Sequence, residues 1–238
     1  MDARTTRERI VEAAAELLAT GGREAVSTRA VSAAAGVQAP TIYRLFGDKQ
    51  GLLDAVAGHG IAEYLHDKTV RERDPDPVAD LRRGWDLHVG FGLAHPALYT
   101  LVFGEPRPGV ESQAQRQSAT VLAGMIGRIA EAGRLRVSEE RAAHLVHSTG
   151  RGITLTLIGM APERRDPALS EFARESVIAT ITTDGPSRAS ADAGPVPAAV
   201  TLRAQLPELA VLTESERVLL REWLDRVADG GRVGPRGS

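Results

Sequence analysis

Residues 27–53 read STRAVSAAAGVQAPTIYRLFGDKQGLL, which is the pattern of two short helices joined by a tight turn, with a third helix following at once. Ser27 is of a type that caps helices, because its hydroxyl accepts backbone N–H groups that lack a partner inside the helix. Gly36 supplies the positive φ that ends a helix at low cost. Pro40 suits the first turn of the second helix, where its missing N–H is not needed. The pattern predicts a helix-turn-helix.

The second helix of this pair is expected to have a buried face and an exposed face. Ile42, Leu45 and Phe46 recur at helical spacing and predict the buried side. Polar and aromatic side chains are left for the solvent side of a short, rigid helix. A helix of this kind is what a helix-turn-helix places in the major groove of DNA.

The spacing Gly36-Val37-x-x-Pro40-Thr41-Ile42-Tyr43-x-x-Phe46-x-x-Lys49-x-x-Leu52-Leu53 closely resembles the DNA-binding domain of tetracycline-repressor (TetR) family regulators. The resemblance covers roughly residues 5–55. It implies an all-α fold with an N-terminal three-helix DNA-binding head, plus a helical-bundle domain for effector binding and dimerisation. The alternative, a three-helix packing unit without DNA affinity, gives no reason for Thr41, Tyr43 and Lys49 to share the solvent side.

The resemblance also assigns DNA contacts residue by residue. Base contacts or contacts to flanking phosphates fall to Gln38, Thr41 and Tyr43, and the basic residues nearby are expected to contact phosphates. The full set of expected DNA-binding residues is Thr28, Arg29, Gln38, Ala39, Pro40, Thr41, Tyr43, Arg44 and Lys49.

Composition limits the class of protein. Cysteine is absent, which excludes disulfides, thiolate metal sites and a cysteine nucleophile. No apolar run approaches the length of a membrane span. The first residues, MDARTTRERIVEAAAELL, lack the layout of a signal peptide, because charges interrupt their helically spaced apolar residues. A cytoplasmic protein without membrane contact is expected. The formal net charge of -2 gives no support for a nucleic-acid partner, so DNA affinity must depend on where the basic residues lie.

Helical periodicity organises the rest of the chain. The first helix is predicted to begin near Thr5 or Thr6, with Thr5 and Glu8 as a capping box, and to end at Gly21-Gly22. A connecting helix runs from Lys49 towards Leu65. Further helices are predicted at 78–95, 97–103, 110–132, 138–160 and 166–182. The expected domains are a helix-turn-helix DNA-binding domain (1–50), a helical ligand-binding and dimerisation domain (51–183), a flexible linker (184–200) and a C-terminal helical extension with a disordered tail (201–238).

The C-terminal region has its own signals. Residues 184–200 are rich in Pro, Gly, Ala and Ser without apolar periodicity, which is typical of a linker or loop. Thr213 and Glu216 form a second capping-box pattern that opens a helix through about Ala228. The apolar residues of that helix are expected to be buried, either by docking on the body or in an extended dimer interface; they are Val218, Leu219, Trp223, Leu224 and Val227.

The helices at 138–160 and 166–182 resemble the pair that packs against its symmetry mate in TetR-family dimers. Small and apolar residues on 142–160 suit close helix packing. A two-fold dimer would present two heads to a palindromic operator in double-stranded DNA. A homodimer is therefore expected, and a purely intramolecular bundle is the alternative.

Aromatic and polar residues on two body helices predict a small-molecule site. Two such faces that meet inside a bundle line a cavity with apolar walls and a few fixed polar groups. Arg151 would then pair with an anionic ligand. The alternative is that the aromatic residues are simple core and that Arg151 pairs with an acid across the dimer. The candidate effector-binding residues are Trp85, His88, Phe91, His95, Tyr99, Phe103, His147, Arg151 and Thr154.

The sequence contains few of the motifs that would indicate a metal site or an enzyme. His144 and His147 stand at i, i+3, but a zinc site needs three or four ligands with supporting groups. No P-loop, GxGxxG, GxSxG or paired-carboxylate motif is present. No metal, cofactor or catalytic residue is expected. The sequence thus predicts a ligand-responsive transcriptional repressor that a small-molecule effector releases from DNA. A ligand-independent activator or architectural DNA-binding protein, and a metal-dependent or enzymatic body, are the alternatives.

Overall fold

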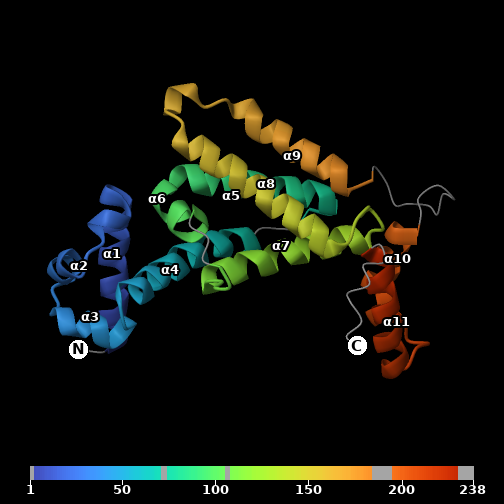
Figure 1. Cartoon of the computed structure of the whole chain (residues 1–238), viewed down its shortest axis with the longest axis horizontal. Coiled ribbons are helices and arrows are strands. Elements are labelled where there is room, and N and C mark those ends of the chain that lie inside the picture. The colour runs from blue at the N-terminus through green and yellow to red at the C-terminus, as the bar shows by residue number, and fades with distance from the viewer. Residues whose placement is uncertain (1–2, 71–73, 105–107, 184–194, 230–238) are drawn as a thin grey trace, which may run out of the picture. The chain divides into compact units, whose positions relative to one another are not determined.

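The computed structural model describes residues 3–70, 74–104, 108–183 and 195–229 (Figure 1). No strand lies within these ranges, and one isolated antiparallel bridge joins Leu135 to Thr182. The all-α prediction is confirmed. In chain order the elements are α1 (Ala3–Ala25), α2 (Thr28–Ala35), α3 (Ala39–Phe46), α4 (Lys49–Val70), α5 (Pro77–Ala94), α6 (Pro96–Tyr99), the π-helix η1 (Thr100–Gly104), α7 (Gln113–Glu131), α8 (Glu139–Gly159), the 3-10 helix η2 (Pro162–Arg164), α9 (Pro167–Ile181), α10 (Pro195–Gln205), the 3-10 helix η3 (Leu206–Glu208) and α11 (Glu214–Ala228).

The chain divides into two compact units that alternate along the sequence. The first unit comprises residues 1–72, 86–119 and 153–165, and the second comprises 73–85, 120–152 and 166–238. Within the described residues no single helix is both long and apolar enough to cross a membrane. Only α5 together with the α6–η1 segment, bent by 110° between them, reaches that length and composition.

The ends of the first three helices follow from local chemistry. α1 begins at Ala3, earlier than the predicted start at Thr5 or Thr6. Gly22, with φ 64° and ψ −168°, interrupts α1 where its end was predicted, and helical turns then resume as far as Ala25. The hydroxyl of Ser27 accepts the N–H of Ala30 at 3.1 Å, which confirms the predicted cap of α2. Gly36 ends α2 in the left-handed conformation, also as predicted.

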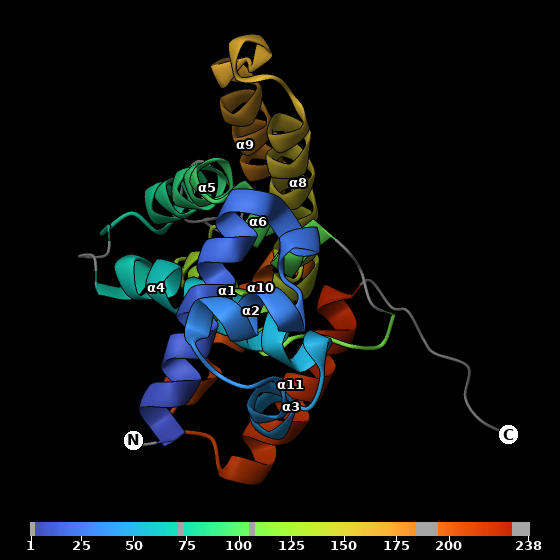
Figure 2. The same ribbon diagram turned by 90° about the vertical axis from the view of Figure 1, so that its left-hand side faces the viewer.

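One apolar core joins α1, α2, α3 and the start of α4. The ribbons of α1, α2 and α3 lie together in Figure 2. The fully buried side chains of this core include Ile10 of α1, Val31 of α2 and Ile42 of α3. Ile42 is the predicted anchor of the second helix of the motif, and its burial leaves the opposite side of α3 for solvent. We refer to this cluster as the head core.

The α6–η1 segment also packs against the head core, through Ala97, Leu98 and Leu101. Leu98 comes so close to α4 that a Cβ built on Gly60 would stand 2.3 Å from Leu98 Cδ2, far inside van der Waals contact. Glycine at position 60 therefore permits this approach of α6 to α4. The consequence is a direct apolar connection between the head core and the segment that follows α5.

The second unit is tied together by polar contacts as well as by apolar ones. Arg128 forms an ion pair with Asp80 at 2.6 Å, and Arg134 forms one with Asp76 at the same distance. The N–H of Arg136 donates to the Ile181 carbonyl at 2.8 Å. Backbone and side-chain contacts thus hold the α5 N-terminus, the α7–α8 connection and the end of α9 in one unit.

The C-terminal helices differ from expectation in two ways. α10 begins at Pro195, so the linker prediction is wrong for residues 195–200, while residues 184–194 lie outside the described residues. The prolines of α10 occupy its first turn, where proline is tolerated, and the following Ala199 and Val200 gain burial. The predicted capping box of Thr213 and Glu216 is confirmed. The predicted disordered tail lies outside the described residues from 230 onward.

α11 buries a different face from the one predicted. It lies beside α10 (Figure 1) and packs on it through Leu220 and Leu224, which stand one turn apart. Of the five apolar residues expected to be buried, only Leu224 is buried within this chain; Trp223 is 52% exposed. Docking of the whole stripe on the body is thus wrong, because a single partner helix covers only a narrow stripe of α11, and its burial in a dimer interface stays a prediction. The other exposed members are Val218, Leu219 and Val227.

Candidate nucleic-acid interface and ligand site

The outward face of α3 carries the side chains predicted to read DNA. Tyr43 is 53% exposed, next to the fully buried Ile42. Gln38 precedes the helix in extended conformation, and its amide makes no capping hydrogen bond. Within the described residues, the side chains of Gln38, Tyr43 and Arg44 have no hydrogen-bond or ion-pair partner. Donors and acceptors on this face are therefore available to another molecule. Pro40 is exposed, and Ala39 and Thr41 are half-buried.

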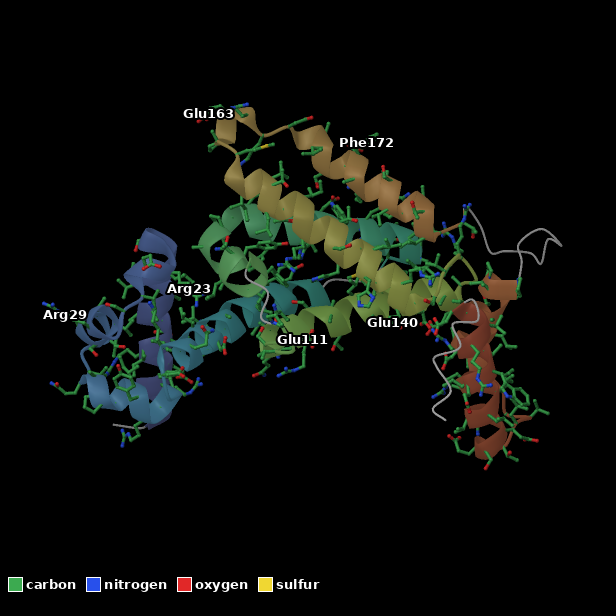
Figure 3. All side chains as sticks on the ribbon, in the orientation of Figure 1. Arg23, Arg29, Glu111, Glu140, Glu163 and Phe172 are labelled. Atoms are coloured by element: carbon green, nitrogen blue, oxygen red, sulfur yellow. The ribbon has the colours of Figure 1, made fainter. Side chains whose placement is uncertain are left out.

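Positive charge flanks α3 on neighbouring elements. Arg29 extends from the outer side of α2 (Figure 3), and Lys49 is exposed at the first residue of α4. Neither side chain forms an ion pair with any residue that the structure describes. Thr28, at the start of α2, is half-buried. Such unpaired cations next to an exposed recognition helix are suited to phosphate contacts, which position a protein on DNA without reading its sequence.

Two arginines of α1 make contacts within the head that attach α1 to the helix-turn-helix. The Arg7 guanidinium lies over the ring of Phe46 at 4.9 Å from the ring centroid, in cation–π geometry. Arg9 Nε donates to the carbonyl of Ala35 at 3.1 Å. These contacts attach α1 to the last turns of α2 and α3. They were not predicted, because no local sequence signal connects residues so far apart.

Several predicted effector residues gather around Tyr99 in the first unit. Tyr99 is completely buried, and its hydroxyl lies 2.7 Å from His88 Nε2. The ring of Phe103 packs beside both, with ring centroids 4.8 Å from Tyr99 and 5.5 Å from His88. Thr154 of α8 is also buried, close to the backbone of Gly92. We call His88, Tyr99, Phe103 and Thr154 the Tyr99 cluster.

Phe91 extends the Tyr99 cluster towards α4. Its ring stacks on Tyr64 with a centroid distance of 4.5 Å. Burial, with a further contribution from Tyr99, raises the pKa of Tyr64 well above its ordinary value, so this hydroxyl stays protonated as a donor. Tyr64 was missed by sequence reasoning, because it stood on the connecting helix outside the two faces considered. The cluster combines aromatic walls with hydroxyl and imidazole groups, which suits recognition of a small apolar molecule with a polar group.

The remaining predicted effector residues lie elsewhere. Trp85, in the second unit, donates from its indole N–H to Ser170 Oγ at 3.0 Å. His147, also in the second unit, lines a cavity of about 480 Å3 on α8, together with His144 and Arg141. Arg151 is half-buried one turn further along α8. His95 is exposed, with its ring 5.3 Å from Phe91. Among the described residues, no group of three or more His, Asp or Glu side chains is arranged to hold a metal ion.

Comparison with known proteins agrees with this geometry. Residues 10–56 match the family model described as bacterial regulatory proteins, tetR family. No curated protein matches the chain.

Three solved structures share the fold over about three quarters of the chain. A protein of unknown function from Rhodococcus sp. RHA1 is 25% identical with a TM-score of 0.62, covering 75% of this chain and 96% of that one. A putative tetR family transcription regulator from Shewanella sp. PV-4 is 21% identical with a TM-score of 0.60, covering 76% and 100%. A single-residue variant of TetR from Acinetobacter baumannii AYE, in complex with minocycline, is 22% identical with a TM-score of 0.58, covering 76% and 96%.

Proposed function

We propose that the chain is a TetR-family transcriptional repressor released from its operator by a small molecule; its residues 10–56 match the model of that family. The observation that carries the proposal is the outward face of α3. Gln38, Tyr43 and Arg44 are exposed there and have no hydrogen-bond or ion-pair partner among the described residues, on a helix whose other side is anchored by Ile42. This is the arrangement by which a helix-turn-helix reads base edges.

Affinity for DNA arises from phosphate contacts at the edges of the same surface. Arg29 and Lys49 stand on either side of α3 in the sequence and are free to neutralise phosphates. Each phosphate contact releases counterions, so binding weakens as salt concentration rises. Local placement of these cations compensates for the net negative charge of the chain.

A homodimer is the proposed functional form, formed through α8 and α9. Phe172 of α9 is 74% exposed (Figure 3), so a large apolar side chain is available at this surface. On α8, Ser148 and Gly152 are exposed small residues, and a Cβ built on Gly152 meets no atom within 4 Å. A second copy would cover Phe172 and pack closely on the small residues. Two heads related by the dimer axis then match a palindromic operator.

The effector is proposed to bind at the Tyr99 cluster, where polar groups are buried among aromatic rings. His88 and Tyr99 would exchange their mutual hydrogen bond for bonds to a ligand. A ligand releases DNA only if it binds better to a conformation that fits the operator poorly. Because η1, which contains Phe103, follows directly on α6, a rearrangement of this cluster would reach the helix that packs on the head core.

The test is selection of bound duplexes from a random DNA pool by the full chain, at one stated salt concentration. A palindromic consensus is expected. Tyr43→Ala should lower affinity for that consensus by at least tenfold, which corresponds to about 1.4 kcal/mol. Trp223→Ala is the matched control, because it removes a comparably exposed aromatic side chain from α11. No enrichment from a folded dimer, or equal loss in both variants, would contradict the assignment of α3 as reader.

A further inference from the structure

A second cavity lies in the first unit, where α1 and α4 meet the corner between α5 and α6. Its volume is about 390 Å3, which is within the range of small-molecule sites. It is separate in composition from the Tyr99 cluster, since none of the four residues of that cluster lines it. No residue of the DNA-reading face lines it, whereas His95, one of the predicted effector residues, does.

The inner wall of this cavity is apolar and closely packed. Leu18 of α1 and Val56 of α4 are buried, and Leu98 of α6 completes the wall. Gly60, which also lines the cavity, leaves room for Leu98 to lie close to α4, since a Cβ built there would stand 2.3 Å from Leu98 Cδ2. The inner wall offers a preformed surface for an apolar body.

The outer wall is acidic. Glu12 and Glu16 stand one turn apart on the same face of α1, and both are exposed. Neither carboxylate forms an ion pair or hydrogen bond within the described residues. Two like charges at i, i+4 repel each other, and a bound cation would relieve that repulsion. His59 and His95 are the other titratable side chains in the lining, and no Lys or Arg is among its residues.

We propose that this cavity binds an organic cation with an apolar body. The positive centre lies between Glu12 and Glu16, and the apolar groups lie on Leu18, Val56 and Leu98. An anion is disfavoured by the carboxylates, and a bare metal ion would leave the apolar wall unused. The occupant touches α1 within the head and α6 beyond it. Its occupancy therefore favours one arrangement of α6 on the head core; the resulting change in operator affinity rests on the proposed function.

The experiment uses tetraphenylphosphonium and tetraphenylborate, two ions of nearly the same size and shape with opposite charge. Isothermal titration calorimetry on the full chain measures binding of each. Saturable binding of one tetraphenylphosphonium per chain is expected, with tetraphenylborate at least tenfold weaker. The double variant Glu12→Gln/Glu16→Gln should weaken binding of the cation about tenfold, since each exposed ion pair contributes only modestly to the affinity.

Two controls fix the location. Glu8→Gln removes the same charge from α1 one turn before Glu12, outside the cavity lining, and should leave the affinity unchanged. Ala19→Trp places a large side chain at an exposed position of the lining and should block binding without disturbing the head core. Equal binding of both ions, or full affinity in the double glutamine variant, would overturn the proposal.

The regulatory consequence is measured separately, as operator affinity with and without tetraphenylphosphonium. A change in operator affinity that disappears in Glu12→Gln/Glu16→Gln is expected. Cation binding without any change would overturn the regulatory part. Failure to select an operator at all would refute the proposed function, whereas the calorimetry on the cavity would still decide the cation site.

Discussion

Gly90 and Gly92 stand on the same helix, α5, and should respond to alanine with different energies. A Cβ built on Gly92 would lie 2.2 Å from Thr154 Cγ2 and 2.9 Å from Tyr99 Cδ2, whereas one on Gly90 meets no atom within 4 Å. Alanine gains about 1 kcal/mol over glycine within a helix. Overpacking of a core costs about 1–3 kcal/mol. Gly90→Ala should therefore be more stable than Gly92→Ala by about 1–3 kcal/mol.

Urea denaturation of the two variants, followed by circular dichroism, measures this difference. Because the nearest atom to the new methyl group is Thr154 Cγ2, Thr154→Ser should reduce the cost of Gly92→Ala while keeping the hydroxyl. The reduction is read from a double-mutant cycle. If both alanine variants gain the same stability, or if Thr154→Ser leaves the cost unchanged, α5 does not pack on the Tyr99 cluster as described.

Three further predictions concern the head and the second unit. Ser27→Ala should lower the free energy of unfolding by about 1 kcal/mol in urea denaturation, because the Ala30 N–H loses its acceptor; no loss would mean that the cap is not formed. Lys49→Ala should weaken binding to all duplexes about equally and reduce the slope of log K against log salt by about 1, which a salt titration checks; a change of sequence preference would contradict a phosphate role. The Arg82 guanidinium, which donates to Glu175 at 3.0 Å, holds the pKa of that carboxyl below its ordinary value. The ion pair therefore contributes up to about 1 kcal/mol to the free energy of unfolding above about pH 4.3, the ordinary pKa of a glutamate. That contribution is lost as the pH falls through the lower pKa of Glu175 in the folded protein. Glu175→Gln should remove this part of the pH dependence of the free energy of unfolding.

Local chemistry explains what could be predicted from the sequence. The Ser27 cap, the left-handed Gly36 and the capping box at Thr213 each depend on residues within three or four positions. These signals set the ends of α2 and the start of α11 correctly. The family resemblance rested on the same kind of short-range pattern, and it is confirmed over residues 10–56.

Long-range packing explains what could not be predicted. Helical spacing put Trp85 and His88 on one face of α5, yet their partners are Ser170 and Tyr99 respectively. Helical periodicity identifies an apolar stripe, but it does not say how many residues of that stripe a neighbouring helix will cover. For that reason Trp223, on α11, was expected to be buried and is exposed. Whether the chain responds to a ligand through Tyr99 was a prediction from the sequence, and it stays one.

The contact of Leu98 with the backbone of Gly60 has a consequence for how the sequence can vary. Any side chain at position 60 would overlap Leu98 as it now lies, so a larger residue there requires Leu98 to move or to be replaced by a smaller one. Relatives that carry a larger residue at the position of Gly60 should carry a smaller one at that of Leu98. In a library randomised at both positions, folded and functional variants should show the same reciprocal volumes. Covariation between positions 60 and 98 would then reveal the contact between α4 and α6 from sequences alone.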